Sequence, residues 1–234
     1  MSNSFQQGHA VVTGSSGGIG KAICEVLLGA GWSVTGLDLS PPTITHDSFV
    51  HHRLDLSDQV QARSVASILG DVDALVHAAG VLRVAPLGKL DAEAGELMWQ
   101  IHVGAASQLA DLLVPAMVER GFGRVVFIGS RVAQGLPGRG QYAATKAAVI
   151  ALARSWAVEV APKGVTVNVV SPGATATPML KDPARAGSAP RLPPIGRLVE
   201  PQEIASMVAY LLSPAAAAIT GQNFNICGGS SLSQ

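Results

Sequence analysis

The sequence is poor in cysteine and in charge. Its two cysteines, Cys24 and Cys227, are far apart and match no metal or redox spacing, so we expect no disulfide and a reducing compartment. Charged residues make up 14% of the 234 positions, and 16 basic residues balance 16 acidic ones. Because no excess of positive charge attracts nucleic acid or an anionic membrane, small molecules are the expected partners.

Long uncharged apolar runs are also missing. The first eight residues are polar and lack the apolar core of a signal peptide. No run of about 18 uncharged apolar residues is present that could span a bilayer. We therefore expect a cytoplasmic protein with no membrane association.

Apolar residues are nevertheless abundant, at 48% of the chain, and they fall into short segments. Short β-branched runs, expected as strands, alternate with Ala- and Leu-rich patterns, expected as helices. The expected strands are residues 9–13, 33–38, 48–54, 73–77, 124–128, 165–170 and 223–226. The expected helices are residues 18–30, 58–69, 96–120, 141–160 and 201–212. This alternation predicts an α/β fold: one Rossmann-like domain over residues 1–234, with a doubly wound, seven-stranded parallel sheet and helices on both faces.

Two segments point beyond a minimal fold of this kind. The expected helices 96–120 and 141–160 carry small or apolar residues around much of their circumference. They are either deeply buried in one subunit or form an interface, and we favour a homo-oligomer, a dimer or tetramer. Residues 171–201 hold seven of the 14 prolines, and this long loop follows the carboxyl end of an expected strand. We expect it to be a lid over the active site.

A glycine-rich turn joins the first expected strand to the first helix. The segment 13–20 reads TGSSGGIG, which places glycines where a pyrophosphate would meet backbone N–H groups. The residues expected to bind the cofactor here are Gly14, Ser16, Gly17, Gly18, Ile19 and Gly20. A side chain at Gly14 or Gly18 would block the approach of the pyrophosphate. The strand–turn–helix setting therefore predicts a dinucleotide site.

The end of the second expected strand indicates which dinucleotide binds. Asp38 stands 18 residues beyond Gly20, where a carboxylate accepts hydrogen bonds from both ribose hydroxyls and repels a 2′-phosphate. No Arg or Lys stands at 15, 16 or 39 to bind such a phosphate, so we expect NAD. Along the same sheet edge we expect further cofactor contacts from Asp55, Leu56, Ala79 and Gly80.

The glycine turn also fits the G-x-S-x-G pattern of serine hydrolases, with Ser16 as the nucleophile. That reading is weaker because this turn follows the first strand, and because the last histidine of the chain, His102, comes too early for a closing triad residue.

A catalytic constellation follows in the second half of the chain. Ser130 ends a strand, and Tyr142 and Lys146 stand four residues apart at the start of a helix. Residues at i and i+4 share a helix face, so the lysine can place its charge beside the phenol and favour phenolate. We expect Tyr142 to exchange the carbinol proton, Ser130 to bind the substrate oxygen, and Lys146 to hold the nicotinamide ribose as well.

These motifs, in this order and spacing, resemble the short-chain dehydrogenases/reductases over nearly the whole chain. The resemblance implies an NAD-dependent oxidoreductase that acts on a secondary alcohol or ketone. It also implies that the segment after the sixth strand holds the nicotinamide carboxamide, through residues Pro172, Gly173, Thr175 and Thr177. Within the family, residues 72–83 and the ending 221–229 look most like dihydrodiol dehydrogenases of dihydroxybenzoate biosynthesis.

The chain departs from the family pattern at two histidines. His77 replaces the first Asn of the usual Asn-Asn-Ala-Gly, and His102 replaces a helix-kinking Asn that takes part in a proton relay. His102 is therefore a candidate catalytic residue, and a buried structural histidine is the equal alternative. We expect His102→Asn to leave kcat/KM within about tenfold.

The substrate stays open at this level. Arg83, Arg131 and Arg139 lie near the expected site and favour a cyclic dihydrodiol, a carboxylated ring or a hydroxy acid. The alternatives are a 3-oxoacyl thioester reductase of the same family and a non-catalytic member that serves as an assembly or regulatory subunit. The spacing of the histidines predicts no metal site.

Overall fold

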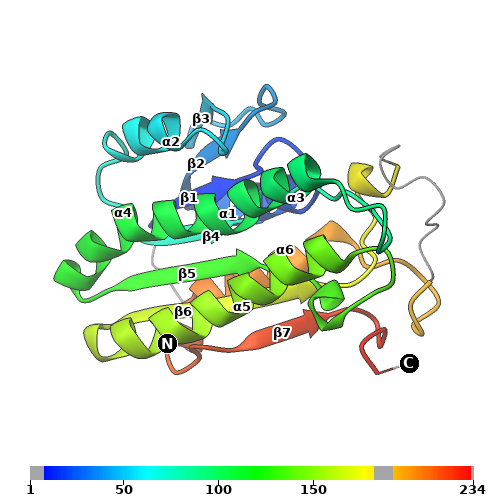
Figure 1. The fold of residues 1–234 in the computed structure, drawn as a ribbon. Coiled ribbons are helices and arrows are strands. Elements are labelled where there is room, and N and C mark those ends of the chain that lie inside the picture. Colours follow the sequence, from blue (N-terminus) through cyan, green and yellow to red (C-terminus); the bar gives the residue numbers. More distant parts are fainter. Residues whose placement is uncertain (1–7, 182–191, 233–234) are drawn as a thin grey trace.

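The computed structural model describes residues 8–181 and 192–232 (Figure 1). Within these residues, seven parallel strands form one sheet in the order β3-β2-β1-β4-β5-β6-β7. The strands are β1 (His9–Thr13), β2 (Ser33–Asp38), β3 (Phe49–Arg53), β4 (Ala74–His77), β5 (Gly123–Ile128), β6 (Val165–Pro172) and β7 (Asn223–Ile226). The predicted α/β fold with a seven-stranded parallel sheet is therefore confirmed.

Helices cover both faces of this sheet, as Figure 1 shows. They are α1 (Gly18–Gly29), α2 (Gln59–Ala66), α3 (Ala92–Trp99), α4 (Ala105–Arg120), α5 (Gly140–Val160) and α6 (Pro201–Leu212). Alternate side chains of each strand enter opposite layers of the core. Val11 and Val125 pack with α2, α4 and α5, whereas Val12 and Val126 pack with α1 and α6.

The sheet reverses its order of winding between β1 and β4. From β1 the chain proceeds outward through β2 to β3, then returns to β4 and continues outward in the other direction to β7. In open parallel sheets, ligands bind beyond the carboxyl ends of the strands at this switch point. The glycine turn after β1 and the loop after β4 both lie there, so the fold itself brings the predicted nucleotide residues together.

The predicted helix 96–120 is wrong in its start and in its continuity. It begins earlier, at α3, because the Asp91 side chain caps the helix by accepting from the backbone N–H of Ala94. A π-helical turn, Gln100–Gly104, then separates α3 from α4, and the Ala105 N–H donates to the Gln100 carbonyl five residues back. A periodic pattern of apolar residues does not reveal such a turn.

The helical run Ala92–Arg120 also bears on membrane association. No membrane-spanning run of uncharged apolar residues is expected from the sequence. By length and composition alone, this helical run is nevertheless long and apolar enough to cross a membrane, with a mean hydropathy of 1.4. In the fold, however, 44% of its apolar window is buried, and Leu109, Leu113 and Met117 belong to the core beneath the sheet. Part of its apolar surface is therefore packed on the sheet.

Candidate active site

The turn between β1 and α1 packs closely against the loop after β4. Gly14 has φ +69°, and a Cβ at this position would lie 2.9 Å from the backbone of Ala79. A Cβ at Gly20 would overlap the Gly14 carbonyl oxygen. Gly14 must therefore be small because another part of the protein approaches it, a reason that is separate from the approach of a cofactor. Gly18 allows the ordinary contact of a Cβ with Thr177 at 3.5 Å, but its φ of +55° disfavours a side chain.

The N-terminus of α1 is open to a ligand. Its N-cap residue, Gly17, makes no side-chain cap, and a Cβ there would meet no atom within 4 Å. Ile19, in the first turn, lines the cavity that is described below. The first N–H groups of a helix lack partners within the helix and carry a partial positive charge. This exposed cradle fits the pyrophosphate of a dinucleotide.

Asp38 lies beside the glycine turn at the end of β2. Its carboxylate accepts hydrogen bonds from the backbone N–H groups of Ser16, at 2.9 Å, and Ser40, at 2.8 Å. A carboxylate has about four acceptor positions, so two remain for ribose hydroxyls. Sequence reasoning missed Arg53, which pairs in register with Asp38 and donates from Nε to the Leu39 carbonyl at 2.9 Å. Only the strand register brings this cation to the nucleotide end of the sheet.

The predicted contacts after β3 and β4 differ in position. Gly80 lines the main cavity, and Ala79 is buried behind it. Leu56 is buried in the core, and the Asp55 carboxylate accepts from the Ser57 N–H at 2.9 Å and the Ser57 hydroxyl at 2.7 Å. Asp55 and Leu56 do not belong to the cavity lining. They support the sheet edge, and their predicted contact with the cofactor stays a prediction.

Ser16 bears on the serine-hydrolase alternative. Its hydroxyl donates to the Ser40 carbonyl at 3.2 Å and lies 3.3 Å from Nε2 of His51. In a catalytic triad a carboxylate must orient the histidine ring. In the part of the chain that the structure describes, no hydrogen bond joins His51 to a carboxylate, so a triad is not assembled at this turn.

The three predicted catalytic residues come together on one cavity wall. Ser130, Tyr142 and Lys146 all line it, from the end of β5 and the first turns of α5. Lys146 Nζ lies 5.9 Å from the centroid of the Tyr142 ring. The Ser130 Oγ accepts from the Val132 N–H at 3.1 Å, and a hydroxyl that accepts one bond still has its own hydrogen to donate to a substrate oxygen.

Lys146 is held in an unusual environment for an ammonium group. It is 4% exposed, and its Nζ donates to the carbonyl of Ile128 at 2.8 Å. Burial lowers the pKa of Lys146 to about 8. The side chain still carries a proton at neutral pH, so it supplies a buried positive charge near the Tyr142 ring. This arrangement can stabilise negative charge that develops on a phenol or on a substrate oxygen.

The cavity that these groups line has a volume of about 970 Å³. It runs from Ile19 past the catalytic trio to Pro172, Gly173, Thr175 and Thr177. A cavity of this size is within the range that holds a dinucleotide's reacting end and a small substrate. Together with the open helix N-terminus and the acceptor capacity of Asp38, its lining fits a nicotinamide dinucleotide.

The far wall of the cavity comes from the expected lid and the C-terminal turn. Within the lid segment 171–201, residues 182–191 lie outside the described residues. The two arms that are described are joined by bonds from the Val199 N–H to the Ala174 carbonyl and from the Ala176 N–H to the Val199 carbonyl, both 2.9 Å. Met179, Leu180, Leu192, Pro194, Ser230 and Ser231 line the cavity here. The two serines gave no sequence signal, because their place depends on how the tail folds back.

The three arginines predicted near the site do not share one role. Arg131 and Arg139 line the cavity, and Arg139 is buried. Arg131 Nη1 also donates to the Ser230 carbonyl at 3.4 Å, which ties the C-terminal turn to this wall. Arg83 is not part of the lining, and its Nη1 donates to the carbonyl of its neighbour Leu82. Two of the three arginines therefore line the cavity, near Ser130 and Tyr142.

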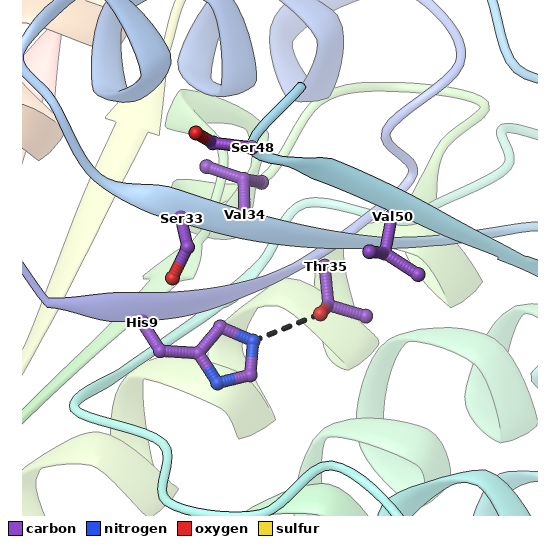
Figure 2. A pocket seen from close by; sticks show the side chains of 6 residues that line it. All are labelled: His9, Ser33, Val34, Thr35, Ser48 and Val50. Atoms are coloured by element: carbon purple, nitrogen blue, oxygen red, sulfur yellow. Dashed lines mark hydrogen bonds between the residues drawn. The ribbon is translucent and has the colours of Figure 1, made fainter. Parts of the chain in front are cut away.

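A second hollow, of about 340 Å³, lies at the other end of the strands from the active-site cavity. Figure 2 shows His9 reaching across it to Thr35, with Nε2 2.8 Å from Oγ1, and the His9 Nδ1 is bonded to the Asp71 carbonyl oxygen. It lies at the amino ends of β1 and β2, away from the switch point. Within residues 8–181 and 192–232, no group of three His, Cys, Asp or Glu side chains is arranged to hold a metal ion.

The amino-acid sequence of the chain is similar to those of proteins in a known family. The family model described as Enoyl-(Acyl carrier protein) reductase matches residues 14–231. The 3-oxoacyl-(acyl-carrier-protein) reductase FabG of Vibrio cholerae is 36% identical over 240 residues, covering 94% of this chain and 96% of that protein. The protein of the same name from Escherichia coli K12 is 37% identical, covering 96% of this chain and 98% of that protein.

Solved structures agree in architecture. One described as a short chain dehydrogenase/reductase family protein has a TM-score of 0.90 at 32% identity, covering 98% of this chain and 99% of the other. The ligand-free aldohexose dehydrogenase of Thermoplasma acidophilum has a TM-score of 0.90 at 26% identity, covering 99% of this chain and 97% of the other.

These similarities settle the family and weaken the finer resemblance. Both curated relatives are 3-oxoacyl reductases, so the comparisons favour the thioester alternative over the expected dihydrodiol subgroup. The family model spans nearly the whole chain, and relatives above 30% identity cover it almost completely. The chain therefore belongs to the short-chain dehydrogenase/reductase family, and it is an oxidoreductase that acts on a CH–OH or keto group.

Proposed function

We propose that this protein interconverts 3-oxoacyl and 3-hydroxyacyl thioesters with NAD(H), and that Tyr142 exchanges the proton. The observation that carries the chemistry is the buried ammonium of Lys146, one helical turn from Tyr142 on the wall that Ser130 also lines. The thioester class is supported by the relatives, which are reductases of this type at 36–37% identity over nearly their full length.

In the direction of reduction, the residues of the chain manage charge and the proton. A nicotinamide dinucleotide held by the glycine turn, Asp38 and Lys146 would supply the hydride for the carbonyl carbon. The carbonyl oxygen, which accepts a hydrogen bond from Ser130, takes the proton of the Tyr142 hydroxyl and becomes the alcohol. The positive charge of Lys146 stabilises the phenolate that is left, and solvent returns the proton to it. Oxidation of the alcohol is the reverse.

The choice of NAD over NADP rests on Asp38. Its carboxylate stands at the end of β2 with acceptor capacity for the ribose hydroxyls, and its negative charge repels a 2′-phosphate. Arg53 on the neighbouring strand is the group that would oppose this preference, and one of its five N–H donors, the Nε–H, is bonded to the Leu39 carbonyl. We therefore expect a clear preference for NADH over NADPH.

A substrate panel tests the proposal. The purified chain is assayed alone with acetoacetyl-CoA and NADH, and with NAD and a cyclic dihydrodiol, an aromatic dihydrodiol carboxylate and short hydroxy acids. We expect the thioester to give the highest kcat/KM. Turnover confined to the dihydrodiols would overturn the thioester assignment, and turnover that needs a second protein chain would favour the regulatory-subunit alternative.

One observation keeps a carboxylated ring or a hydroxy acid as a second candidate. Arg131 and Arg139 both line the substrate end of the cavity, and a guanidinium binds a carboxylate with two parallel hydrogen bonds. Arg131→Ala separates the two cases. It raises KM at least tenfold for a carboxylate substrate and leaves KM for the uncharged thioester of N-acetylcysteamine within about twofold.

Assembly, location and the lid are proposed on the same footing. The outer face of α5 exposes Ala144, Ala147, Ala151 and Val158, small or apolar side chains that deep burial in one subunit would have covered. We propose a cytoplasmic homo-oligomer, a dimer or tetramer, with this face in the interface. Light scattering of the parent and of a Val158→Glu variant tests this proposal, and a parent that is monomeric would contradict it. The segment 171–201 is the proposed lid.

A further inference from the structure

The two histidines at which the chain departs from its family are joined to the same structural element. His77 ends β4 and His102 lies within the π-helical turn Gln100–Gly104. They are 1% and 0% exposed, so every polar atom of the two rings needs a partner inside the protein. Their partners form a hydrogen-bond network that runs between the glycine turn and α5.

His77 connects the glycine turn to the π-turn. Its Nε2 lies 3.0 Å from the carbonyl oxygen of Ile101, and its Nδ1 lies 3.0 Å from the Thr13 hydroxyl. A carbonyl can only accept, so Nε2 carries the hydrogen and Nδ1 accepts from Thr13. The Thr13 hydroxyl in turn accepts from the backbone N–H groups of Ala78 and Ala79, both at 3.0 Å.

His102 connects the π-turn to the catalytic helix. The Val81 N–H donates to its Nε2 at 3.0 Å, so the ring hydrogen is on Nδ1, which lies 2.8 Å from the Thr145 hydroxyl. That hydroxyl donates to the Tyr142 carbonyl at 2.8 Å. The His102 ring also meets the Tyr142 ring edge to face, with centroids 5.4 Å apart at 88°. The network therefore fixes both the backbone and the ring of the tyrosine.

All four ring nitrogens of the two histidines are engaged in hydrogen bonds inside the protein, which favours a structural role over proton transfer. Burial lowers the pKa of His77 to about 3, and the charge of Lys146 contributes. Burial likewise lowers the pKa of His102 well below its usual range, and the positive charge of Lys146 lowers it further. Both rings are thus neutral, each donates one hydrogen bond and accepts another, and the two have opposite tautomers.

We infer that His77 and His102 are positioning residues: paired neutral imidazoles that clamp the π-turn between the glycine turn and α5 and so fix the place of Tyr142. The inference rests on the proposed function, because Tyr142 is the group positioned. A misplacement of about 1 Å at a reacting group costs on the order of a hundredfold in rate. The network thereby couples the nucleotide turn, through Thr13, to the phenol that exchanges the proton.

Nitrogen NMR tests the network without any turnover. In the parent protein with ¹⁵N-labelled histidine, long-range proton–nitrogen spectra at pH 7 should show His77 with hydrogen on Nε2 and His102 with hydrogen on Nδ1. Both should stay neutral to about pH 5. Assignment uses His77→Asn and His102→Asn. A protonated ring at pH 7, or the same tautomer at both positions, would overturn the inference.

Kinetics of matched variants test the positioning role. His102→Leu removes both hydrogen bonds, and we expect kcat for acetoacetyl-CoA reduction to fall about a hundredfold while KM for NADH stays within about threefold. His102→Asn keeps a donor near Nδ1, so we expect kcat/KM within about tenfold of the parent. His9→Leu, at the amino end of β1 and outside the lining of the active-site cavity, serves as the control with unchanged kcat (Figure 2).

The outcomes separate this inference from the proposed function. A folded His102→Leu with parental kcat would contradict the positioning role, as would a loss that Asn does not rescue. If His102→Leu does not fold, His77→Asn, which can keep one of the two bonds of that ring, supplies the kcat-against-KM comparison. If the parent protein does not turn over the thioester, the proposed function is contradicted and the histidine network is not. The tautomers are measured by NMR in the same sample and do not depend on turnover.

Discussion

The two ends of the cleft offer different kinds of chemical groups to a ligand. At the nucleotide end, between β1 and β2, the groups offered to a ligand are backbone N–H groups at the start of α1 and the partly exposed carboxylate of Asp38. At the catalytic end, between β5 and α5, they are side chains held in the interior: Ser130 is 8% exposed and Lys146 4%. Binding at the nucleotide end therefore depends on the backbone conformation, whereas chemistry at the catalytic end depends on buried polar side chains.

This difference predicts how each end responds to change. Backbone groups cannot be deleted by mutation, so the nucleotide end is damaged chiefly by added bulk, and the damage includes folding. Buried side chains can be removed with little change of shape, and their loss affects the chemical step more than binding. Four variants, from the largest expected effect to the smallest, test whether the two ends are separable in this way.

The largest effect is expected at the phenol. Tyr142→Phe removes only the hydroxyl, so kcat for acetoacetyl-CoA reduction should fall about a thousandfold while the Kd of NADH, measured by fluorescence, stays within about threefold. Tyr210, the other tyrosine of the chain, is 44% exposed on α6, and Tyr210→Phe is the matched control. A Tyr142→Phe enzyme as fast as the parent would remove the proposed proton transfer.

At the nucleotide end the expected loss is in stability as well as in binding. Gly14→Ala places a Cβ 2.9 Å from the Ala79 backbone at φ +69°, and we expect the free energy of unfolding to fall by about 3 kcal/mol. Gly17→Ala meets open space at an extended φ of −162°, so the free energy of unfolding should change by less than about 0.5 kcal/mol. Urea titrations measure both. Equal losses would mean that the turn is not shaped by its contact with Ala79.

A smaller effect is expected for cofactor choice. Asp38→Asn removes the negative charge but keeps the acceptor oxygen, so the preference for NADH over NADPH in kcat/KM should fall about thirtyfold, or about 2 kcal/mol. The double variant with Arg53→Ala asks whether that guanidinium then binds the 2′-phosphate. If Asp38→Asn leaves the ratio unchanged, the carboxylate does not select the cofactor.

The same contrast explains what could be read from the sequence. The strands follow from β-branched runs bounded by turns, and the nucleotide turn is a contiguous motif, so local patterns were sufficient for both. Tyr142 and Lys146 were also within reach, because an i, i+4 pair on one helix face is a local relation.

Features built by distant contacts were not predictable. The π-turn at Gln100–Gly104 follows no hydrophobic period. The resemblance indicates a helix kink at His102, but the contacts of the turn with His77 and Thr145 form only in the folded chain. The register of β2 with β3 decides that Arg53 comes beside Asp38. The cavity wall at Ser230 depends on the tail packing against Arg131. In each case the partner is supplied by tertiary structure, which a single sequence does not specify locally.

The last prediction asks whether the buried charge costs stability. The pKa of Lys146 is about 8 in the folded protein and about 10.5 when unfolded, so between these values the unfolded chain binds more protons. Folding stability must then rise with pH above about 8. Relative to Lys146→Met, which has no such group, the parent should gain about 1 kcal/mol in free energy of unfolding between pH 7 and pH 9.

Urea titrations of the ligand-free proteins at both pH values measure this gain, and the ionisable groups remote from Lys146 cancel in the difference. Lys21→Met is the control, since Lys21 is a surface residue paired with Glu25 at 2.9 Å. Identical pH slopes for Lys146→Met and the parent would mean that Lys146 is solvated like Lys21. The catalytic end would then lack the buried charge that distinguishes it from the nucleotide end.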